Sequence, residues 1–217
     1  MPTKPQIVLL HATPIAMAPI QSAFTAGWPE AEVVNLLDDG LTIDPAREAD
    51  LSPAMIRRFV KFGRYGAGLD AAGFLVTCSA FGPAIDALAD SLNIPVLKPN
   101  EAMFHAAAAA GSRIGMLATF GPSVPTMTAE FDECVAAVGA PATVVVPDAI
   151  DLLRAGNART HNRLVAEHAP DPMGCDAIMP AHLSTSCAAS NVRAVVRTPV
   201  FTAPDAAVAR MRALVHA

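Results

Sequence analysis

Short runs of apolar residues alternate along this chain with longer segments of helical periodicity, and this alternation constrains the fold more than any other feature. Most of the runs are continuous stretches of Val, Ile and Leu, as expected for parallel strands buried on both faces of a sheet. Together they predict an α/β fold. Strands are expected at residues 6–10, 32–36, 73–77, 94–97, 113–118, 142–146, 177–181 and 199–202. Helices are expected between them, for example at residues 53–65, 83–92, 124–138, 158–168 and 205–215.

The eight expected strands fall into two sets of four with matching spacing. The third strand of each set leads into Cys78 and His182, which are 104 residues apart, and the fourth strands place Val96 and Val200 at the same separation. This spacing predicts two pseudo-symmetric halves, residues 1–99 and 100–204, with the helix at 205–217 packing back on the first. Each half would be a four-stranded parallel sheet flanked by helices, with the active site in the cleft between them.

The composition narrows the class of protein. Of the 217 residues, 53% are hydrophobic and 16% charged, which excludes a disordered chain. The net charge of −5 opposes nucleic-acid binding, which needs a basic surface. No apolar run reaches the roughly 18 to 20 residues that span a bilayer, and the run at 7–10 is too short for a signal peptide. We therefore expect a cytoplasmic protein with no nucleic-acid or membrane partner, its four cysteines reduced.

Cys78 is the strongest candidate for chemistry. In open parallel sheets, ligands bind beyond the carboxyl ends of the strands. Cys78 stands there in the segment FLVTCSAFGPAID, just before a helix that Pro83 is suited to begin. The N-terminus of a helix stabilises a thiolate and also binds carboxylates. The alternative for Cys78 is the ordinary one, a buried and inert cysteine.

His182 occupies the corresponding place in the second half. It could be a structural histidine, but its correspondence with Cys78 favours a functional role. Two acid/base groups that face each other across a cleft can remove a proton from one face of a carbon atom and return it to the other. Such a pair is the chemistry of a racemase that needs no cofactor.

Polar residues at other strand ends are candidates for binding a substrate carboxylate: His11, Thr77, Ser79, Thr119 and Ser184. Each hydroxyl alone is more often a cap or turn residue. No metal site is expected, because the spacing of Cys175, His182 and Cys187 is unlike that of zinc ligands. His161 and His168, seven residues apart on an expected helix, are interpreted as part of a solvated face.

The chain resembles the aspartate/glutamate racemase superfamily, which includes hydantoin racemases, maleate isomerases and arylmalonate decarboxylases. The segments that carry the resemblance are VTCSAFGPAI, RIGMLATFGPSV and CDAIMPAHLSTS. It covers essentially the whole chain and implies two α/β halves, a catalytic cysteine after the third strand of each, no cofactor, and a dimer or larger oligomer. Where the family would place the second cysteine, this chain has His182 in the segment Pro-Ala-His-Leu.

Four hypotheses about function remain open. The first is a racemase or epimerase of a small carboxylate, with Cys78 as the thiolate and His182 as the opposing acid/base. The second is a single-cysteine enzyme similar to maleate isomerase or arylmalonate decarboxylase. The third is a cysteine hydrolase in which a histidine activates Cys78, although no orienting carboxylate is evident. The fourth is a non-catalytic small-molecule binding protein on the same fold.

Overall fold

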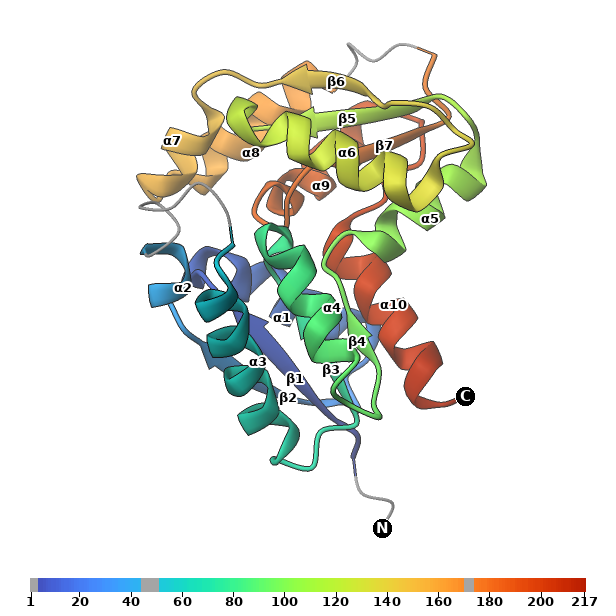
Figure 1. The fold of residues 1–217 in the computed structure, drawn as a ribbon. Coiled ribbons are helices and arrows are strands. Elements are labelled where there is room, and N and C mark those ends of the chain that lie inside the picture. The colour runs from blue at the N-terminus through green and yellow to red at the C-terminus, as the bar shows by residue number, and fades with distance from the viewer. Residues whose placement is uncertain (1–3, 44–50, 170–173) are drawn as a thin grey trace. The chain divides into compact units, whose positions relative to one another are not determined.

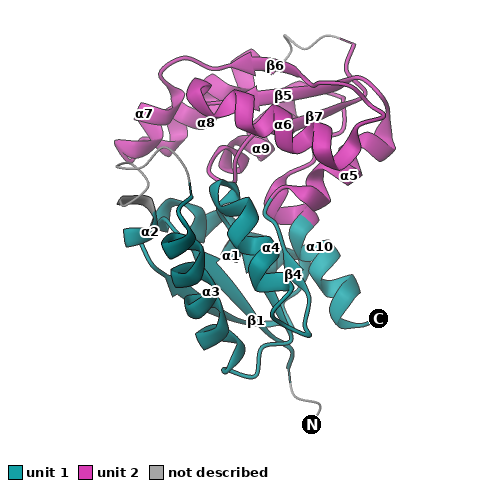
Figure 2. Cartoon of the chain, in the orientation of Figure 1, with its two compact units in different colours: residues 1–99, 207–217 teal, residues 100–206 magenta. Residues whose placement is uncertain are grey.

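The computed structural model describes residues 4–43, 51–169 and 174–217. The chain divides into two compact units, residues 1–99 with 207–217 and residues 100–206 (Figure 2). It passes from one unit to the other twice, and the second passage lies within helix α10 (Ala203–Val215). Every pair of neighbouring strands is parallel, so the α/β class predicted from the sequence is confirmed.

Unit 1 contains a four-stranded sheet in the order β2-β1-β3-β4 (Figure 1). Its central strand β1 reads QIVLLH, and the four residues from Ile7 to Leu10 are fully buried, as a strand covered on both faces requires. The elements are β1 (Gln6–His11), η1 (Pro14–Ala16), α1 (Met17–Gly27), β2 (Glu32–Leu37), α2 (Gly40–Ile43), α3 (Pro53–Ala67), β3 (Gly73–Val76), η3 (Ser79–Phe81), α4 (Gly82–Ala89) and β4 (Val96–Leu97), followed by most of α10.

Helices α3 and α4 of unit 1 pack closely against each other. The start of α3 is fixed by Ser52, whose hydroxyl accepts a hydrogen bond from the Met55 N–H, and by Pro53 in the first turn. Gly63 lets α4 approach, because a Cβ atom there would lie 2.5 Å from a methyl group of the buried Leu88. The position of α4 relative to α3 is therefore set by close packing.

Helix α10 packs within unit 1 beside α1. The Arg212 guanidinium donates a hydrogen bond to the Gly27 carbonyl, and the ring of His216 meets the buried Trp28 edge-on at 5.5 Å. At the start of β3, Gly73 leaves room for Met211, whose sulfur would lie 2.5 Å from a Cβ atom. Helix α10 is thus part of the packed core of unit 1.

Unit 2 contains a three-stranded sheet in the order β6-β5-β7. Its strand order repeats that of the first three strands of unit 1, with the first strand in the middle. The elements are α5 (Glu101–Ala110), β5 (Ile114–Ala118), η4 (Gly121–Ser123), α6 (Val124–Val135), β6 (Ala142–Val145), α7 (Ala149–Arg154), α8 (Ala158–His168), β7 (Ala177–Pro180), η5 (Thr185–Ala188) and α9 (Ala189–Val195).

The prediction of an eighth strand at residues 199–202 is wrong. Only Val200 pairs with Ile178, in an isolated parallel bridge. The Ile178 N–H donates to the Pro199 carbonyl, and the Phe201 N–H donates to the Ile178 carbonyl. Proline has no N–H to continue such a ladder, so the pairing ends after one residue.

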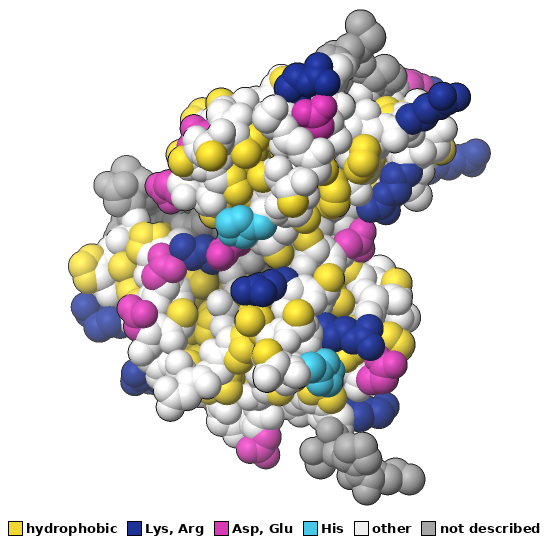
Figure 3. All heavy atoms as spheres, turned by 90° about the vertical axis from the view of Figure 1, so that its right-hand side faces the viewer, with side chains coloured by type: hydrophobic (Ala, Val, Ile, Leu, Met, Phe, Trp, Pro, Cys, Tyr) yellow, Lys and Arg dark blue, Asp and Glu magenta, His cyan; other side chains and the backbone are white. Residues whose placement is uncertain are grey.

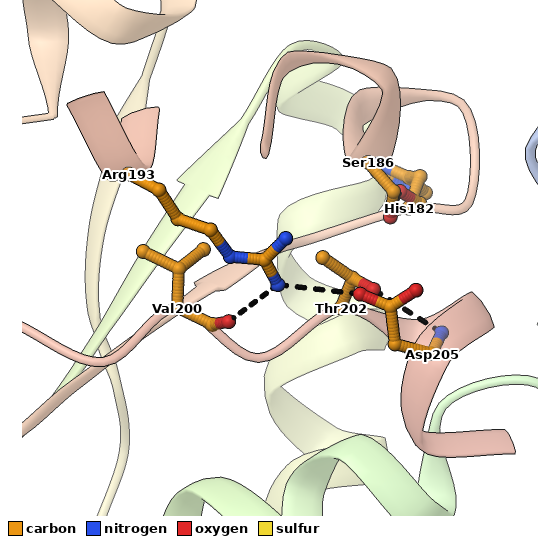
Figure 4. Close-up of polar contacts among 6 residues, drawn as sticks. All are labelled: His182, Ser186, Arg193, Val200, Thr202 and Asp205. Carbon is orange, nitrogen blue, oxygen red and sulfur yellow. Dashed lines mark hydrogen bonds and ion pairs between the residues drawn. The ribbon is translucent and has the colours of Figure 1, made fainter. Parts of the chain in front are cut away.

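The chain turns into α10 immediately after this bridge. The Thr202 hydroxyl accepts a hydrogen bond from the Asp205 N–H at 3.2 Å, which satisfies a donor in the first turn of the helix. Arg193 of α9 donates to the Val200 carbonyl at 2.9 Å and to the Asp205 carboxylate at 3.2 Å (Figure 4). These contacts fix the segment at the edge of the sheet without extending it.

The described helices are all too short or too polar to cross a membrane. On the face shown in Figure 3, basic and acidic side chains lie in small neighbouring groups among uncharged ones.

Candidate active site

Cys78 follows the carboxyl end of the third strand of unit 1. Leu10 of β1 pairs with Val76 of β3, and the Thr77 N–H donates to the Leu10 carbonyl at 3.0 Å. The ladder ends there, and Cys78 is the next residue. Its backbone is extended, with φ −132° and ψ 116°, and its side chain is half-buried. The thiol thus stands where the strand gives way to a helical turn, as the sequence predicted.

His182 holds the same position in unit 2. Leu117 of β5 pairs with Pro180 of β7, and the Ala181 N–H donates to the Leu117 carbonyl at 2.9 Å. His182 is the next residue, just as Cys78 follows Thr77. The two side chains are therefore equivalent in their own sheets, down to the last hydrogen bond of each ladder.

A buried polar network precedes Cys78. His11 is fully buried, and its Nε2 lies 2.9 Å from the Asn35 amide oxygen while its Nδ1 lies 2.9 Å from the Thr77 hydroxyl. Burial lowers the pKa of His11, although the Asn35 hydrogen bond opposes this, so the ring is neutral. Because an amide oxygen can only accept, Nε2 carries the proton and donates to Asn35, and the Thr77 hydroxyl lies within hydrogen-bond distance of both Nδ1 and the Leu10 carbonyl. This network braces the ends of β1, β2 and β3.

Protonation of buried histidines should make stability depend on pH. The pKa of His11 and that of His182 are lowered in the fold, so below pH 6.5 the unfolded chain binds more protons than the folded chain. The free energy of unfolding should therefore be highest above pH 6.5. It should fall as the pH drops from 6.5 towards the folded-state pKa values, by at most about 1.4 kcal/mol per pH unit for each proton.

Urea denaturation at a series of pH values measures this effect. We expect His11→Asn to reduce the loss of stability just below pH 6.5. A pH profile that is identical in wild type and His11→Asn would contradict the neutral, buried state of His11.

The imidazole of His182 is held by Ser123, which ends η4. The Ser123 Oγ lies 2.8 Å from His182 Nε2 and 2.7 Å from the Phe120 carbonyl. A hydroxyl has one proton, and the carbonyl can only accept it, so the hydroxyl must accept from Nε2–H. His182 Nδ1 is then left with a lone pair and makes no hydrogen bond within the described residues. Burial lowers the pKa of His182 and so favours the neutral form of the ring.

The tautomer of His182 can be tested without a substrate. In ¹⁵N-histidine-labelled protein, we expect the His182 signals of a neutral ring protonated on Nε2. Ser123→Ala should weaken this preference because the acceptor is lost, while Ser123→Thr should keep it because the hydroxyl remains. A wild-type ring protonated on Nδ1 would show that the assignment is incorrect.

The hydroxyl groups predicted to bind a carboxylate differ in their burial and in their hydrogen bonds. Thr77 and Thr119 are buried, and the Thr119 hydroxyl bonds that of the buried Thr185 at 3.0 Å. Ser79 and Ser184 are partly exposed and make no side-chain hydrogen bond within the described residues. Among the hydroxyls predicted from the sequence, these two are therefore available to a ligand from their own unit.

His161 does not lie on a solvated face, and that part of the sequence interpretation is wrong. It is fully buried, and positions 161, 164, 165 and 168 form the inward stripe of α8, a spacing that the sequence already contained. The Cys187 thiol donates to the Asn162 amide oxygen at 3.1 Å, and burial raises the pKa of that thiol. Cys187 is thus engaged with α8. No cluster of three metal-ligating side chains is found in the described residues.

The structure therefore defines an α/β protein whose two units have parallel sheets of related order, with a thiol and an imidazole at equivalent strand ends. The Asp/Glu/Hydantoin racemase family matches residues 39–169, and the chain belongs to that family. The resemblance found in the sequence is confirmed. The family assignment supports an isomerase of the racemase type that acts on small substrates. The matched residues include Cys78 but end before His182.

Solved structures of racemases are similar over nearly the whole chain. Allantoin racemase from Klebsiella pneumoniae has a TM-score of 0.73 and 16% identity, covering 98% of this chain and 88% of that one. An aspartate racemase homologue from Pyrococcus horikoshii OT3 has a TM-score of 0.72 and 14% identity, covering 99% and 100%. Glutamate racemase isoform RacE1 from Bacillus anthracis has a TM-score of 0.68 and 13% identity, covering 99% and 83%. At these identities the likeness shows the fold. A search of curated proteins finds no match.

Proposed function

We propose that this protein is a cofactor-independent racemase or epimerase of a small carboxylate, with Cys78 and His182 as its two acid/base groups. The observation that carries the proposal is their equivalence: each is the second residue beyond the third strand of its own sheet. A racemase needs one proton acceptor and one proton donor of this kind. The family resemblance, which implies a catalytic residue after the third strand of each half, supports a catalytic role for both residues.

The proton balance of the reaction fits a thiol and an imidazole. In one direction, the Cys78 thiolate removes the α-proton and the His182 imidazolium returns a proton to the opposite face, leaving a neutral thiol and a neutral imidazole. In the reverse direction, His182 Nδ1 removes the proton and the thiol donates one. Burial lowers the pKa of His182 and so favours the neutral pair in the empty site. Its Nε2–H stays on Ser123 throughout, which leaves Nδ1 as the reacting atom.

The carboxylate and the developing enolate need donors that are already in place. We propose that Ser79 and Ser184 supply two of them, because their hydroxyls are partly exposed and unused. His11, Thr77 and Thr119 were predicted to bind substrate, but their buried side chains bond to other residues of their own units. We propose that these three act by holding the strand ends in position.

A single-thiol enzyme is the second candidate, and one observation favours it. In an isomerase or decarboxylase of this superfamily, one cysteine is enough. The cysteine that follows His182, Cys187, donates its thiol hydrogen bond to Asn162, and burial disfavours its thiolate. Cys187 therefore does not replace the missing second thiol, and His182 would then bind substrate without exchanging protons.

Incubation in D₂O distinguishes these candidates. The protein is mixed with a panel of small amino acids, dicarboxylic acids, hydantoins and maleate, and each compound is followed by proton NMR and chiral chromatography. Loss of the α-proton signal together with inversion supports the racemase. Exchange without inversion, or a new product, supports a single-thiol enzyme. Exchange and inversion that persist in Cys78→Ala would overturn the proposal.

A further inference from the structure

We propose that a groove between α3 and α4 of unit 1 binds a small organic anion with an apolar body. The groove is formed by seven side chains, six from these two helices and Ser91 from just beyond the end of α4, and has a volume of about 430 Å³. This is within the range of about 300 to 1,000 Å³ that is usual for small-molecule sites. None of its lining residues is among those assigned to the reaction, so this proposal is independent of the proposed function.

Three cations lie along the groove. Arg57, Lys61 and Arg64 line it from α3, at the i, i+4 and i+7 positions that share one face of a helix. Helix α3 contains no acidic residue, and none of the three forms an ion pair in the part of the chain that the structure describes. Neighbouring like charges at this spacing repel each other. An anion in the groove would relieve that repulsion.

The charge of Arg64 is fixed in place but not neutralised. Its Nε donates to the Ser91 hydroxyl at 3.4 Å, and that hydroxyl donates in turn to the Leu88 carbonyl at 2.9 Å. Ser91 also lines the groove. The contact is long but directs the guanidinium through a neutral partner, so its terminal nitrogens remain available for the bidentate contact that arginine makes with carboxylates and phosphates.

Two cations outside the groove are paired with acidic residues of unit 1. Arg58, the neighbour of Arg57 on the same helix, pairs with Asp38 at 2.7 Å, and Lys98 pairs with Asp86 at 2.8 Å. Arg58 and Lys98 thus have acidic partners, whereas the three groove cations have none among the described residues. In a chain with a net charge of −5, this is a local concentration of unmatched positive charge.

The ligand should also have an apolar part. Ile56 and Val60 of α3 and Ala87 of α4 line the groove together with the cations. An inorganic phosphate would use the charges and leave this apolar surface exposed to water. A phosphate or carboxylate that bears a ring or a short acyl chain would cover both kinds of surface.

Titration calorimetry with phenyl phosphate tests the proposal, and phenol and inorganic phosphate serve as matched probes. We expect one saturable site for phenyl phosphate. Phenol and inorganic phosphate should each bind with an affinity that is lower by a factor of about ten or more. The double variant Arg57→Ala/Lys61→Ala should weaken phenyl phosphate binding about tenfold or more, and added salt should weaken it in the wild type. Arg58→Ala, on the same helix but outside the groove, should bind as the wild type does.

Chemical-shift changes in labelled protein locate the ligand. Shifts confined to α3 and α4 support the groove, whereas saturable binding with shifts centred on Cys78 or His182 overturns it. Absence of saturable binding, or binding that the double variant leaves intact, also overturns it. These outcomes do not depend on turnover, so they are independent of the test of the proposed function.

Discussion

Cys78→Ala is expected to reduce racemisation, and the α-proton exchange of the enantiomer whose proton the thiolate removes, by a factor of about 10³ or more on the compound that the D₂O panel identifies. A positioned general base contributes about 10² to 10⁴ to a rate, and alanine leaves no base at this position, so the loss should approach the upper part of that range. The Cys187 thiol is not a substitute, since it is bonded to Asn162 and its pKa is raised by burial. The effect should appear in kcat more than in KM, because the thiol acts on the reacting carbon.

The matched control is Cys134→Ala, which removes another half-buried thiol, in the last turn of α6. It should keep wild-type exchange and a similar thermal midpoint. Cys78→Ser serves as the second control, because it preserves the size of the side chain but is a far weaker base. If Cys78→Ala folds and retains racemisation within about tenfold of wild type, the thiol is not one of the two acid/base groups and the proposed mechanism fails.

The α/β fold could be predicted from sequence because its determinants are local. Continuous apolar runs such as Ile7 to Leu10 identify buried parallel strands, and the helix at Ala158–His168 has the predicted ends. The eighth strand could not be predicted reliably. Val200 lies in an apolar stretch of the kind that forms strands. Pro199 before it and the helix cap at Thr202 after it limit the strand pairing to one bridge. That outcome depends on a tertiary pairing with Ile178.

The site was only partly predictable, for a similar reason. Spacing alone led to Cys78 and His182, because both follow strands of matched length. Spacing could not show that His11 is sealed inside by Asn35, since their contact arises from the register of β1 against β2. Asn35 is the one polar residue within the apolar stretch of its strand, and this is the signal that could have drawn attention to it.

In the proposed mechanism, the use of a histidine in place of a second cysteine has a chemical consequence. Two thiols would be interchangeable in form, whereas a thiol and an imidazole differ in the charge of their protonated states. A neutral thiol and neutral imidazole form one resting state, and a thiolate with an imidazolium forms the other. Burial around His182 favours the first, in which, under the proposed mechanism, His182 would be the acceptor and Cys78 the donor. The empty enzyme should therefore be poised for one enantiomer more than for the other.

This asymmetry makes His182→Gln the most informative second variant. The glutamine amide can still donate to Ser123, so the loop should keep its conformation, but it cannot accept or return a proton. Racemisation in both directions should fall by about 10² to 10⁴, because each direction needs both groups. Cys78 should still exchange the α-proton of one enantiomer with D₂O, without inversion. Chiral chromatography combined with proton NMR on each pure enantiomer measures the two processes separately.

His182→Cys is the companion variant, because it places a thiol where the family resemblance leads one to expect it. It should recover part of the racemisation that His182→Gln loses, with a different dependence on pH. If the His182→Gln variant instead racemises both enantiomers at the wild-type rate, His182 is not an acid/base group. If it abolishes exchange of both enantiomers while the protein remains folded, His182 is needed for binding, and the single-thiol alternative gains support. Only loss of inversion with retained one-sided exchange identifies a two-base mechanism that uses a histidine.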